Sequence, residues 1–475
     1  TDTTVLVTAG DEGGSGDGDS FRPSISEDGT WVSFTSYAHN LKGATSSAQF
    51  CNIYLWNAET GDCKLISVNP DKTYADGFSD YSSINADGTH IAYESDANTL
   101  SLTSLSDNYY NVFLWDAEAD DSILISARPD GTQADSDSYE PSISADGNKI
   151  AFQSFATDLI ADLTLSTPEW NSNIYVWDAS APTKLITAGT SGTGGNTGSW
   201  LPSISGDGTK VAYLSEATNL GGVVPTNGWE NAFIAEIDSL ETKLISAGAS
   251  GSGANGNTDW PSTSYDGSFV SFVSWATDQI GAPTSLDDWH VFLCDVATLD
   301  CTLITAGPNG TGANADSEIN SISYDGTKVA FDSAASNLVG APTANTETWD
   351  TFLWQRATTV TVTFDGQNGT PLLTVDVPQG TPVTEPIPPT KAGYTFDGWW
   401  TEPVGGSEWM FDTPILADMT LYAHWIANDQ PVPPEPVKPD VPPTGDSFGF
   451  MSVLTLLAPA GLVFVSAGLS KKRSK

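Results

Sequence analysis

Aromatic and acidic side chains recur just before a repeated Asp-Gly dipeptide, and they are the residues best suited to bind a ligand. They stand six or seven residues before the dipeptide, and the set comprises Phe21, Tyr81, Tyr139, Trp200 and Trp260, with Asp80, Glu140, Asp259 and Glu318 as the neighbouring carboxylates. Aromatic rings stack on sugars and carboxylates hydrogen-bond to them, and the same groups hold a cationic peptide. The structural alternative is that the rings fill space between sheets.

Residues for catalysis are scarce. Only four histidines occur, His39, His90, His290 and His424, and no GxSxG segment accompanies them, so a hydrolytic triad is not indicated. Carboxylates that could cleave a glycosidic bond in pairs are abundant, but their separation is invisible in a sequence. We therefore assign no catalytic residue. A binding protein is favoured, an extracellular glycoside hydrolase or lyase that uses loop carboxylates is the alternative, and enzyme activity stays open.

The charge of the chain limits its partners. Seventeen Lys and Arg residues stand against 60 Asp and Glu residues, which gives a net charge of -43. Such a field repels nucleic acid, so no nucleic-acid partner is expected, and it suits a soluble exposed protein. Loops rich in Gly, Asn and Asp at 71–80, 130–137 and 309–316 could coordinate calcium, with flexible turns as the alternative. Calcium is the one cofactor considered, and no metal ligand is assigned.

The Asp-Gly dipeptide marks an internal repeat. It recurs at Asp28, Asp87, Asp146, Asp207, Asp266 and Asp325, with spacings of 59, 59, 61, 59 and 59 residues. In each copy, a short Ser/Ile segment precedes the dipeptide and an alternating apolar segment follows it, which predicts a β-hairpin. Two further alternating runs predict four antiparallel strands per copy, the composition of a propeller blade.

The first and last repeats are out of phase with the others. The opening segment TTVLVTAG at 3–10 matches the fourth strand of later copies, such as KLITAG at 184–189, while the sixth copy ends near Trp354 without a fourth strand. Supplying the missing strand from the N-terminus would pair the open edges of the first and last blades. The segment PSISADGNKIAFQS at 141–154 resembles the repeat of TolB-like (WD40-like) propellers. That resemblance implies a six-bladed β-propeller over residues 1–358, closed by the N-terminal strand.

Four cysteines test this strand register. Cys294 should lie opposite Cys301 across a hairpin, where a disulfide suits an exported protein. A second bridge, between Cys51 and Cys63, is less favoured, because Cys51 should point to the opposite face of its sheet from Cys63.

A different module begins at residue 359. The segments VTVTFDGQNG, PPTKAGYTFDGWW at 388–400 and DTPILADMTLYAHW at 412–425 resemble the internalin-type B-repeat of bacterial surface proteins. The resemblance implies a small β-grasp-like domain over residues 359–427, with a spacer or adhesion role.

The C-terminal region reads as an anchor. A Pro-rich linker at 428–446 ends in a VPPTGD motif, an apolar stretch at 447–470 predicts a transmembrane helix, and a basic cytoplasmic tail occupies 471–475. This order resembles the LPxTG-like sorting signal of sortase substrates, with the motif formed by Val441, Pro442, Pro443, Thr444 and Gly445. The resemblance implies cleavage by a sortase and attachment of Thr444 to peptidoglycan. Val441 stands where the family usually has Leu.

Together these patterns predict an all-β protein with one C-terminal transmembrane helix. We expect it outside the cell, attached to the wall of a Gram-positive-type bacterium, where its propeller binds a glycan or protein ligand for adhesion or display. Membrane contact is expected only through the C-terminal helix, before cleavage.

Overall fold

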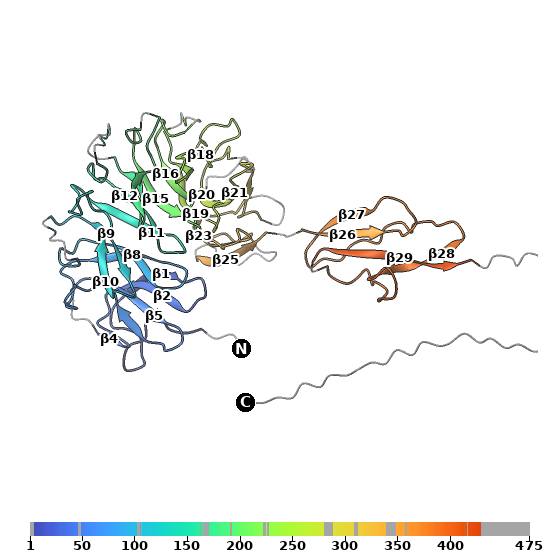
Figure 1. Cartoon of the computed structure of the whole chain (residues 1–475), viewed down its shortest axis with the longest axis horizontal. Helices are drawn as coiled ribbons and strands as arrows, with labels where there is room; N and C mark the ends of the chain where they lie inside the picture. The colour runs from blue at the N-terminus through green and yellow to red at the C-terminus, as the bar shows by residue number, and fades with distance from the viewer. Residues whose placement is uncertain are drawn as a thin grey trace, which may run out of the picture. The chain divides into compact units, whose positions relative to one another are not determined.

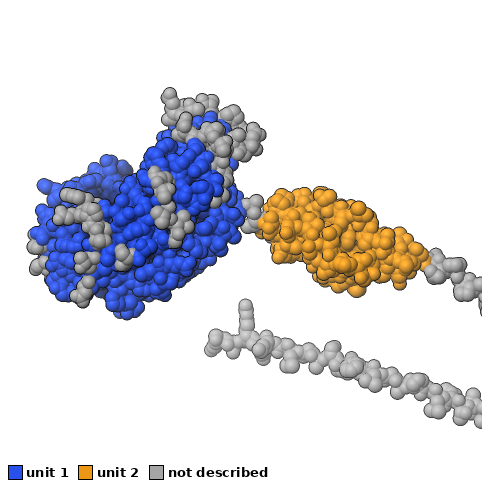
Figure 2. Space-filling view, turned by 90° about the horizontal axis from the view of Figure 1, so that it is seen from above, with its two compact units in different colours: residues 1–358 blue, residues 359–475 orange. Residues whose placement is uncertain are grey.

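The structure is a computed structural model. It describes residues 4–45, 49–101, 105, 107–161, 163, 165, 171–190, 192–221, 225, 228–279, 288–307, 312–338, 348–356, 359–415 and 417–428. These residues form strands and turns and contain no helix. The chain divides into two compact units, residues 1–358 and 359–475 (Figure 2).

In the first unit each repeat folds into one antiparallel sheet whose main strands follow chain order. Five sheets have four strands: β1 (Ser20–Ile25), β2 (Trp31–Ser36), β5 (Asn52–Asn57) and β6 (Cys63–Leu65); β7 (Ser79–Ile84), β8 (His90–Ser95), β9 (Asn111–Asp116) and β10 (Asp121–Leu124); β11 (Ser138–Ile143), β12 (Lys149–Ser154), β13 (Asn173–Asp178) and β14 (Ala181–Leu185); β15 (Ser199–Ile204), β16 (Lys210–Ser215), β17 (Asn231–Glu236) and β18 (Thr242–Leu244); β19 (Thr258–Thr263), β20 (Phe269–Ser274), β21 (His290–Asp295) and β22 (Cys301–Leu303). The sixth has three, β23 (Ser317–Ile322), β24 (Lys328–Ser333) and β25 (Asp350–Gln355), and a short ribbon pairs β3 (Asn40–Leu41) with β4 (Ala44–Thr45).

The sheets are arranged around a common centre. The first strand of each sheet, β1, β7, β11, β15, β19 or β23, contributes residues to one cavity. Figure 1 shows the labelled strands β1, β11, β15, β19 and β23 gathered about this centre. The radial arrangement is that of a β-propeller, and the predicted hairpins and strand order are confirmed.

The Asp-Gly turns hold neighbouring sheets together. In the third repeat the Asp146 carboxylate accepts hydrogen bonds from the Ser144 hydroxyl and the Asn148 amide, and Gly147 takes the left-handed conformation that the turn requires. Backbone bonds then link successive turns. The amide of Ala86 donates to the carbonyl of Ala145, whose own amide donates to the carbonyl of Gly206. This short Ser-x-Asp-Gly sequence therefore forms the hairpin and joins it to its neighbour.

Closure of the ring by the N-terminal strand, as the sequence predicts, is wrong. Instead of pairing with β25, the opening segment pairs within the first repeat, where Ala9 bridges Ser15 and Gly10 bridges Leu41. Val5 and Leu6 are exposed, and the sixth sheet keeps three strands. The similarity of 3–10 to the fourth strands is real, but it extends into the turn that follows each of them. Later copies form the same local bridge, as between Val68 and Tyr74, so part of the resemblance reflects this turn and not a fourth strand.

The predicted transmembrane helix at 447–470 is the second correction to the fold class. Among the residues whose structure is described, no helix is long and apolar enough to cross a membrane. Residues 447–470 lie outside that part of the chain. The fold class of the described residues is all-β.

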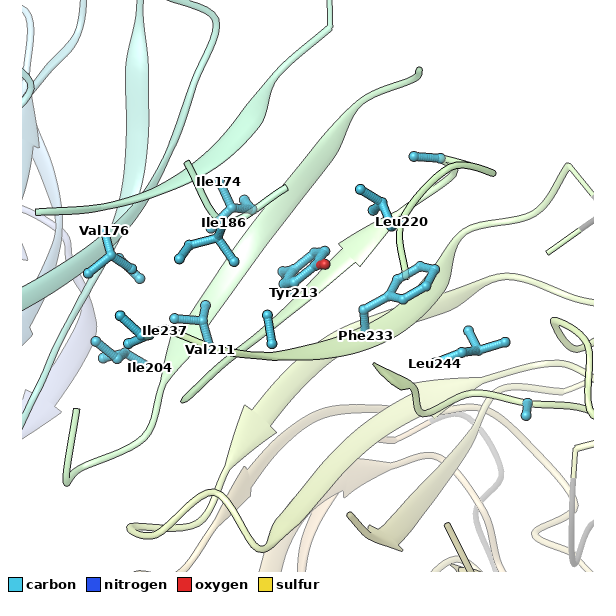
Figure 3. Packing of buried hydrophobic residues seen from close by; sticks show 14 residues of the cluster. Ile174, Val176, Ile186, Ile204, Val211, Tyr213, Leu220, Phe233, Ile237 and Leu244 are labelled. Atoms are coloured by element: carbon cyan, nitrogen blue, oxygen red, sulfur yellow. The ribbon is translucent and has the colours of Figure 1, made fainter. Parts of the chain in front are cut away.

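Aromatic pairs form the centre of every sheet. Each pair joins the second strand to the third, with ring centroids 5.6 to 5.9 Å apart in a stacked arrangement: Phe34–Tyr54, Tyr93–Phe113, Phe152–Tyr175, Tyr213–Phe233, Phe272–Phe292 and Phe331–Phe352. Figure 3 shows the fourth pair, Tyr213 and Phe233, beside Ile174 and Ile186 from the third sheet. Side chains from successive sheets thus share one core, from the first and second sheets to the fifth and sixth.

Cys294 and Cys301 face each other on β21 and β22 and form a disulfide, with a Cα separation of 4.0 Å. Cys51 and Cys63 are both buried and free, so the structure has no bond between them. Burial raises the pKa of the Cys63 thiol to about 11.

The second unit is a four-stranded sheet in the order β27-β26-β29-β28, in which β26 and β29 run parallel. Its strands are β26 (Thr359–Asp365), β27 (Leu373–Pro378), β28 (Tyr394–Trp400) and β29 (Met419–Ala427). Phe364, Trp399 and Leu421 lie in its buried core. The module is therefore a folded domain with a hydrophobic centre of its own.

Replacing Phe233 with Ala should lower the free energy of unfolding by about 3–5 kcal/mol, because the ring is fully buried and its loss leaves a cavity. Chemical denaturation measures the change. Ile123→Ala, at an exposed position of β10, serves as the control and should change stability by about 0.5 kcal/mol or less. Equal losses in the two variants would contradict the shared core.

Candidate functional site

Each innermost strand is interrupted by a bulge at the same point. The strand register shifts there in all six sheets. Within each bulge one non-glycine residue takes a positive φ between 41° and 53°: Arg22, Tyr81, Glu140, Leu201, Trp260 and Ile319. This conformation costs roughly 1–2 kcal/mol per residue, and a bulge redirects the side chain it contains. The strain repeats in every blade, and all six residues line one cavity.

The cavity has a polar half and an apolar half. Its volume is about 800 Å³. Arg22, Tyr81 and Glu140 come from the first three sheets, whereas Leu201, Trp260 and Ile319 come from the last three. Because Tyr81 and Trp260 lie three sheets apart in a ring of six, they stand on opposite sides of the cavity. A ligand here would meet aromatic surface on two sides and charge mainly on one.

The positive charge in the polar half is held in place. The Arg22 guanidinium forms an ion pair with Asp80 and lies over the Tyr81 ring, 3.7 Å from its centroid. Asp80 also accepts hydrogen bonds of 2.8 Å from the Tyr81 amide and the Thr35 hydroxyl. The arrangement combines a cation–π contact with a charge-assisted hydrogen bond.

Carboxylates serve as acceptors for the amides that the bulges expose. Glu94 accepts from the Glu140 amide at 2.7 Å, Glu140 accepts from the Leu201 amide at 3.1 Å, and Asp259 accepts from the Trp260 amide at 2.8 Å. A bulge removes an amide from the strand ladder, so that amide needs another partner. These acidic side chains therefore stabilise the backbone that shapes the cavity.

Burial makes these carboxylates hard to ionise. Only 5% of Glu94 is exposed, and burial raises its pKa to about 8, with the neighbouring charges of Glu140 and Asp80 acting in the same direction. Burial also raises the pKa values of Glu140 and Asp259. Among the described residues that line the cavity, Arg22 is the only cation and Glu140 is the only carboxylate.

The eight residues proposed from the sequence divide between two positions in the strand. Tyr81 and Trp260 line the cavity, and Asp80 and Asp259 hold the amides of these two residues. The others lie elsewhere: Phe21 contacts Tyr37, Tyr139 contacts Tyr110, Trp200 packs into the core between the fourth and fifth sheets, and Glu318 is exposed beside the cavity-lining Ile319. Their part in ligand binding stays a prediction.

Sequence reasoning missed Arg22, Leu201 and Glu94, and it considered Glu140 only as a carboxylate beside the aromatic residues. Arg22, Glu140 and Leu201 stand six residues before the aspartate of the Asp-Gly dipeptide, as Tyr81 and Trp260 do. The earlier set mixed the sixth and seventh positions because it followed aromatic character. Holding the spacing at six would have found the three cavity residues, whereas Glu94 lies on β8 and carries no comparable signal.

The calcium prediction concerned three acidic loops. Asp71 and Asp130 each accept hydrogen bonds from the threonine two residues later in the chain, Thr73 and Thr132 respectively. No group of three or more His, Cys, Asp or Glu residues that could hold a metal ion occurs in the described part of the chain. Part of the third loop, residues 309–311, falls outside that part.

Comparison with known proteins identifies the second unit. Residues 361–424 match the family model of the Listeria-Bacteroides repeat domain. Internalin H of Listeria monocytogenes is 39% identical over 93 residues, which are 19% of this chain and 16% of that protein. A putative membrane protein of Evansella cellulosilytica is 37% identical over 73 residues, 15% of this chain and 11% of its own length. The matched segments thus span less than a fifth of either relative. The predicted surface-protein repeat is confirmed.

Solved structures resemble the chain more distantly. TolB from Acinetobacter baumannii has a TM-score of 0.35 at 14% identity and covers 60% of this chain and 53% of its own. An oligogalacturonate lyase in complex with manganese has a TM-score of 0.43 at 14% identity and covers 70% of this chain and 78% of its own. These scores carry no argument about function.

The raised pKa of Glu94 predicts a dependence of stability on pH. Its ordinary value is 4.5 and its value in the folded protein is about 8. The folded state therefore keeps a proton that the unfolded chain has lost between these two values, and stability falls as pH rises through this window. The contribution of Glu94 should be at most about 1.4 kcal/mol per pH unit. Glu94→Gln should flatten the decline, as followed by denaturant titrations from pH 5 to 8.

The control for this measurement is Glu118→Gln, which changes an exposed carboxyl in the turn between β9 and β10. This variant should keep the wild-type slope. A slope in Glu94→Gln as steep as that of the wild type would show that Glu94 is ionised in the folded protein at neutral pH.

Proposed function

We propose that this protein is a cell-wall-attached surface protein of a Gram-positive-type bacterium whose propeller binds an extracellular ligand in the cavity between its innermost strands. The observation that carries the proposal is the cavity itself, into which six bulged strands direct Arg22, Tyr81, Glu140, Leu201, Trp260 and Ile319. Non-glycine residues held at positive φ are costly, and such strain gathers at functional sites. A glycan or a protein segment is the kind of ligand that aromatic and acidic walls suit.

The remainder of the chain supports a display role. The second unit matches the Listeria-Bacteroides repeat domain, part of this chain is similar to internalin H, and the second unit would act as a spacer or adhesion module. We further propose that a sortase joins Thr444, in the motif formed by residues 441–445, to peptidoglycan. The prolines of 428–446 favour extended geometry at about 3 Å per residue and would keep the folded units away from the wall.

An extracellular glycoside hydrolase or lyase remains the less favoured function. Glycoside cleavage needs two carboxyl groups that are free to accept or donate protons. Glu94, Glu140 and Asp259 each accept a hydrogen bond from the backbone. Uptake of a proton by Glu140 or Asp259 would weaken a bond that supports a bulge, whereas Glu94, whose pKa is about 8, already holds its proton at neutral pH.

Trp260→Ala should weaken binding by about 2 kcal/mol, or roughly thirtyfold, to whichever glycan or protein of a purified array binds the wild type most tightly. The reason is that the ring forms one side of the cavity and is 37% exposed. Biolayer interferometry would measure the affinity. Trp349→Ala, which changes an exposed tryptophan that does not line the cavity, is the matched control and should bind normally. Normal binding by Trp260→Ala would remove the cavity from consideration.

Thr444→Ala should abolish covalent attachment to the wall, because the threonine carbonyl would form the bond to peptidoglycan. In a Gram-positive host that expresses the chain with a secretion signal, the wild type should stay in the wall fraction after boiling in detergent, and the variant should be lost from that fraction. Thr370→Ala, which changes an exposed threonine in the second unit, is the control. Equal wall retention of the Thr444 and Thr370 variants would exclude this attachment.

A further inference from the structure

The cavity already contains one bound guanidinium, that of its own Arg22. This group comes from the first sheet and is held by the second, where Asp80 forms the ion pair and the Tyr81 ring lies 3.7 Å from the guanidinium carbon. An acidic residue followed directly by an aromatic residue thus forms a small cation site. The aromatic residue sits in the bulge, and its amide fixes the carboxylate.

The fifth sheet contains the same pair at the same two positions. Asp259 and Trp260 stand seven and six residues before their Asp-Gly dipeptide, as Asp80 and Tyr81 do. The amide-to-carboxylate distance is 2.8 Å in both sheets, and both aromatic residues have a positive φ. The two pairs therefore share the bond from the ring residue's amide to the carboxylate, while Asp80 alone also accepts from the Thr35 hydroxyl.

The two sites differ in what the preceding sheet supplies. Arg22 occupies the bulge ahead of the Asp80–Tyr81 pair, whereas Leu201 occupies the bulge ahead of the Asp259–Trp260 pair. A leucine cannot form an ion pair, and no ion pair among the described residues involves Asp259. Trp260 lines the cavity and remains 37% exposed. The second site therefore has the walls of a cation site without an internal cation.

The electrostatic environment favours a cation at this second site. Glu140 and Glu230 lie close enough for the negative charge of Asp259 to oppose their ionisation. The whole chain carries a net charge of -43, which attracts basic partners and speeds their association. Neutral ligands gain nothing from this field.

We infer that the cavity binds an arginine side chain of an extracellular polypeptide, with its guanidinium paired to Asp259 and stacked on Trp260. The inference rests on the proposed function and specifies the ligand of the same cavity. Arginine is favoured over lysine because a planar guanidinium both pairs with a carboxylate and stacks on a ring, as Arg22 does. The apolar side chains of Leu201 and Ile319 would contact the methylene groups of the ligand.

Calorimetry on the full chain tests the inference with two capped tripeptides, acetyl-Gly-Arg-Gly-amide and its citrulline counterpart. Citrulline has nearly the same shape without the charge, so it should bind at least about tenfold more weakly. Asp259→Asn should reduce the affinity for the arginine peptide by a similar factor. Equal binding of the two peptides, or full affinity in Asp259→Asn, would overturn the inference.

Leu201→Arg provides a sharper test, because it recreates in the fourth sheet the residue that fills the first site. The new guanidinium should occupy the Asp259–Trp260 pair and compete with the peptide, so that binding is lost. Ile123→Arg, which adds the same charge at an exposed position of β10 that does not line the cavity, should retain binding, and both variants should keep the wild-type melting temperature. Unchanged affinity in a folded Leu201→Arg variant would count against the site.

Two further outcomes separate this inference from the broader proposal. An array ligand that needs Trp260 but binds Asp259→Asn normally, together with no binding of the arginine peptide, would overturn the arginine assignment and leave ligand binding in the cavity intact. Free arginine that binds more tightly than the capped peptide would overturn the assignment to a polypeptide and indicate an amino-acid ligand instead.

Discussion

In each blade, the residue six positions before the Asp-Gly turn lies in the left-handed region, and the geometry of the cavity depends on this backbone constraint. The conformation costs roughly 1–2 kcal/mol per residue and takes an amide out of the strand ladder. For Tyr81, Glu140, Leu201 and Trp260, a carboxylate receives that amide. The turn-to-turn hydrogen bonds between neighbouring sheets act on the same strands from their far ends. Together these bonds keep six strained residues directed at one point.

A repeated backbone with unlike side chains produces a directional site. All six bulges share one geometry, but Arg22, Tyr81 and Glu140 occupy one half of the ring and Leu201, Trp260 and Ile319 the other. Exact repetition would surround the cavity with equivalent groups and offer a ligand no preferred orientation. Because the blades carry different side chains at this position, a ligand can distinguish one side of the cavity from the other.

The sequence predicted the repeated sheets more successfully than it predicted the site. The Asp-Gly period and the alternating apolar runs indicate hairpins and strands, since both follow from local chemistry. The prediction that the N-terminal strand closes the ring failed, because resemblance between residues 3–10 and an outer strand does not determine which edge that segment joins. The sequence identified only part of the site, because strand alternation breaks at a bulge. Residues such as Arg22 or Glu140 give no sign in a sequence that they take a positive φ. Predicting the role of Glu94 would have required the strand register between β7 and β8, which brings Glu94 opposite Asp80.

The buried carboxylates explain why the cavity suits recognition better than proton transfer. A general acid or base must change its protonation state at each turnover, and its hydrogen bonds must tolerate the change. Glu140 accepts the Leu201 amide, and that amide belongs to a residue already held in a strained conformation. Protonation of the carboxylate would weaken this bond and so relax the bulge that positions Leu201. A bound cation acts in the opposite direction at Glu140 and Asp259, because it favours their ionised forms, which accept the bulge amides more strongly. The shape of the cavity and its occupancy by a positive group therefore support each other.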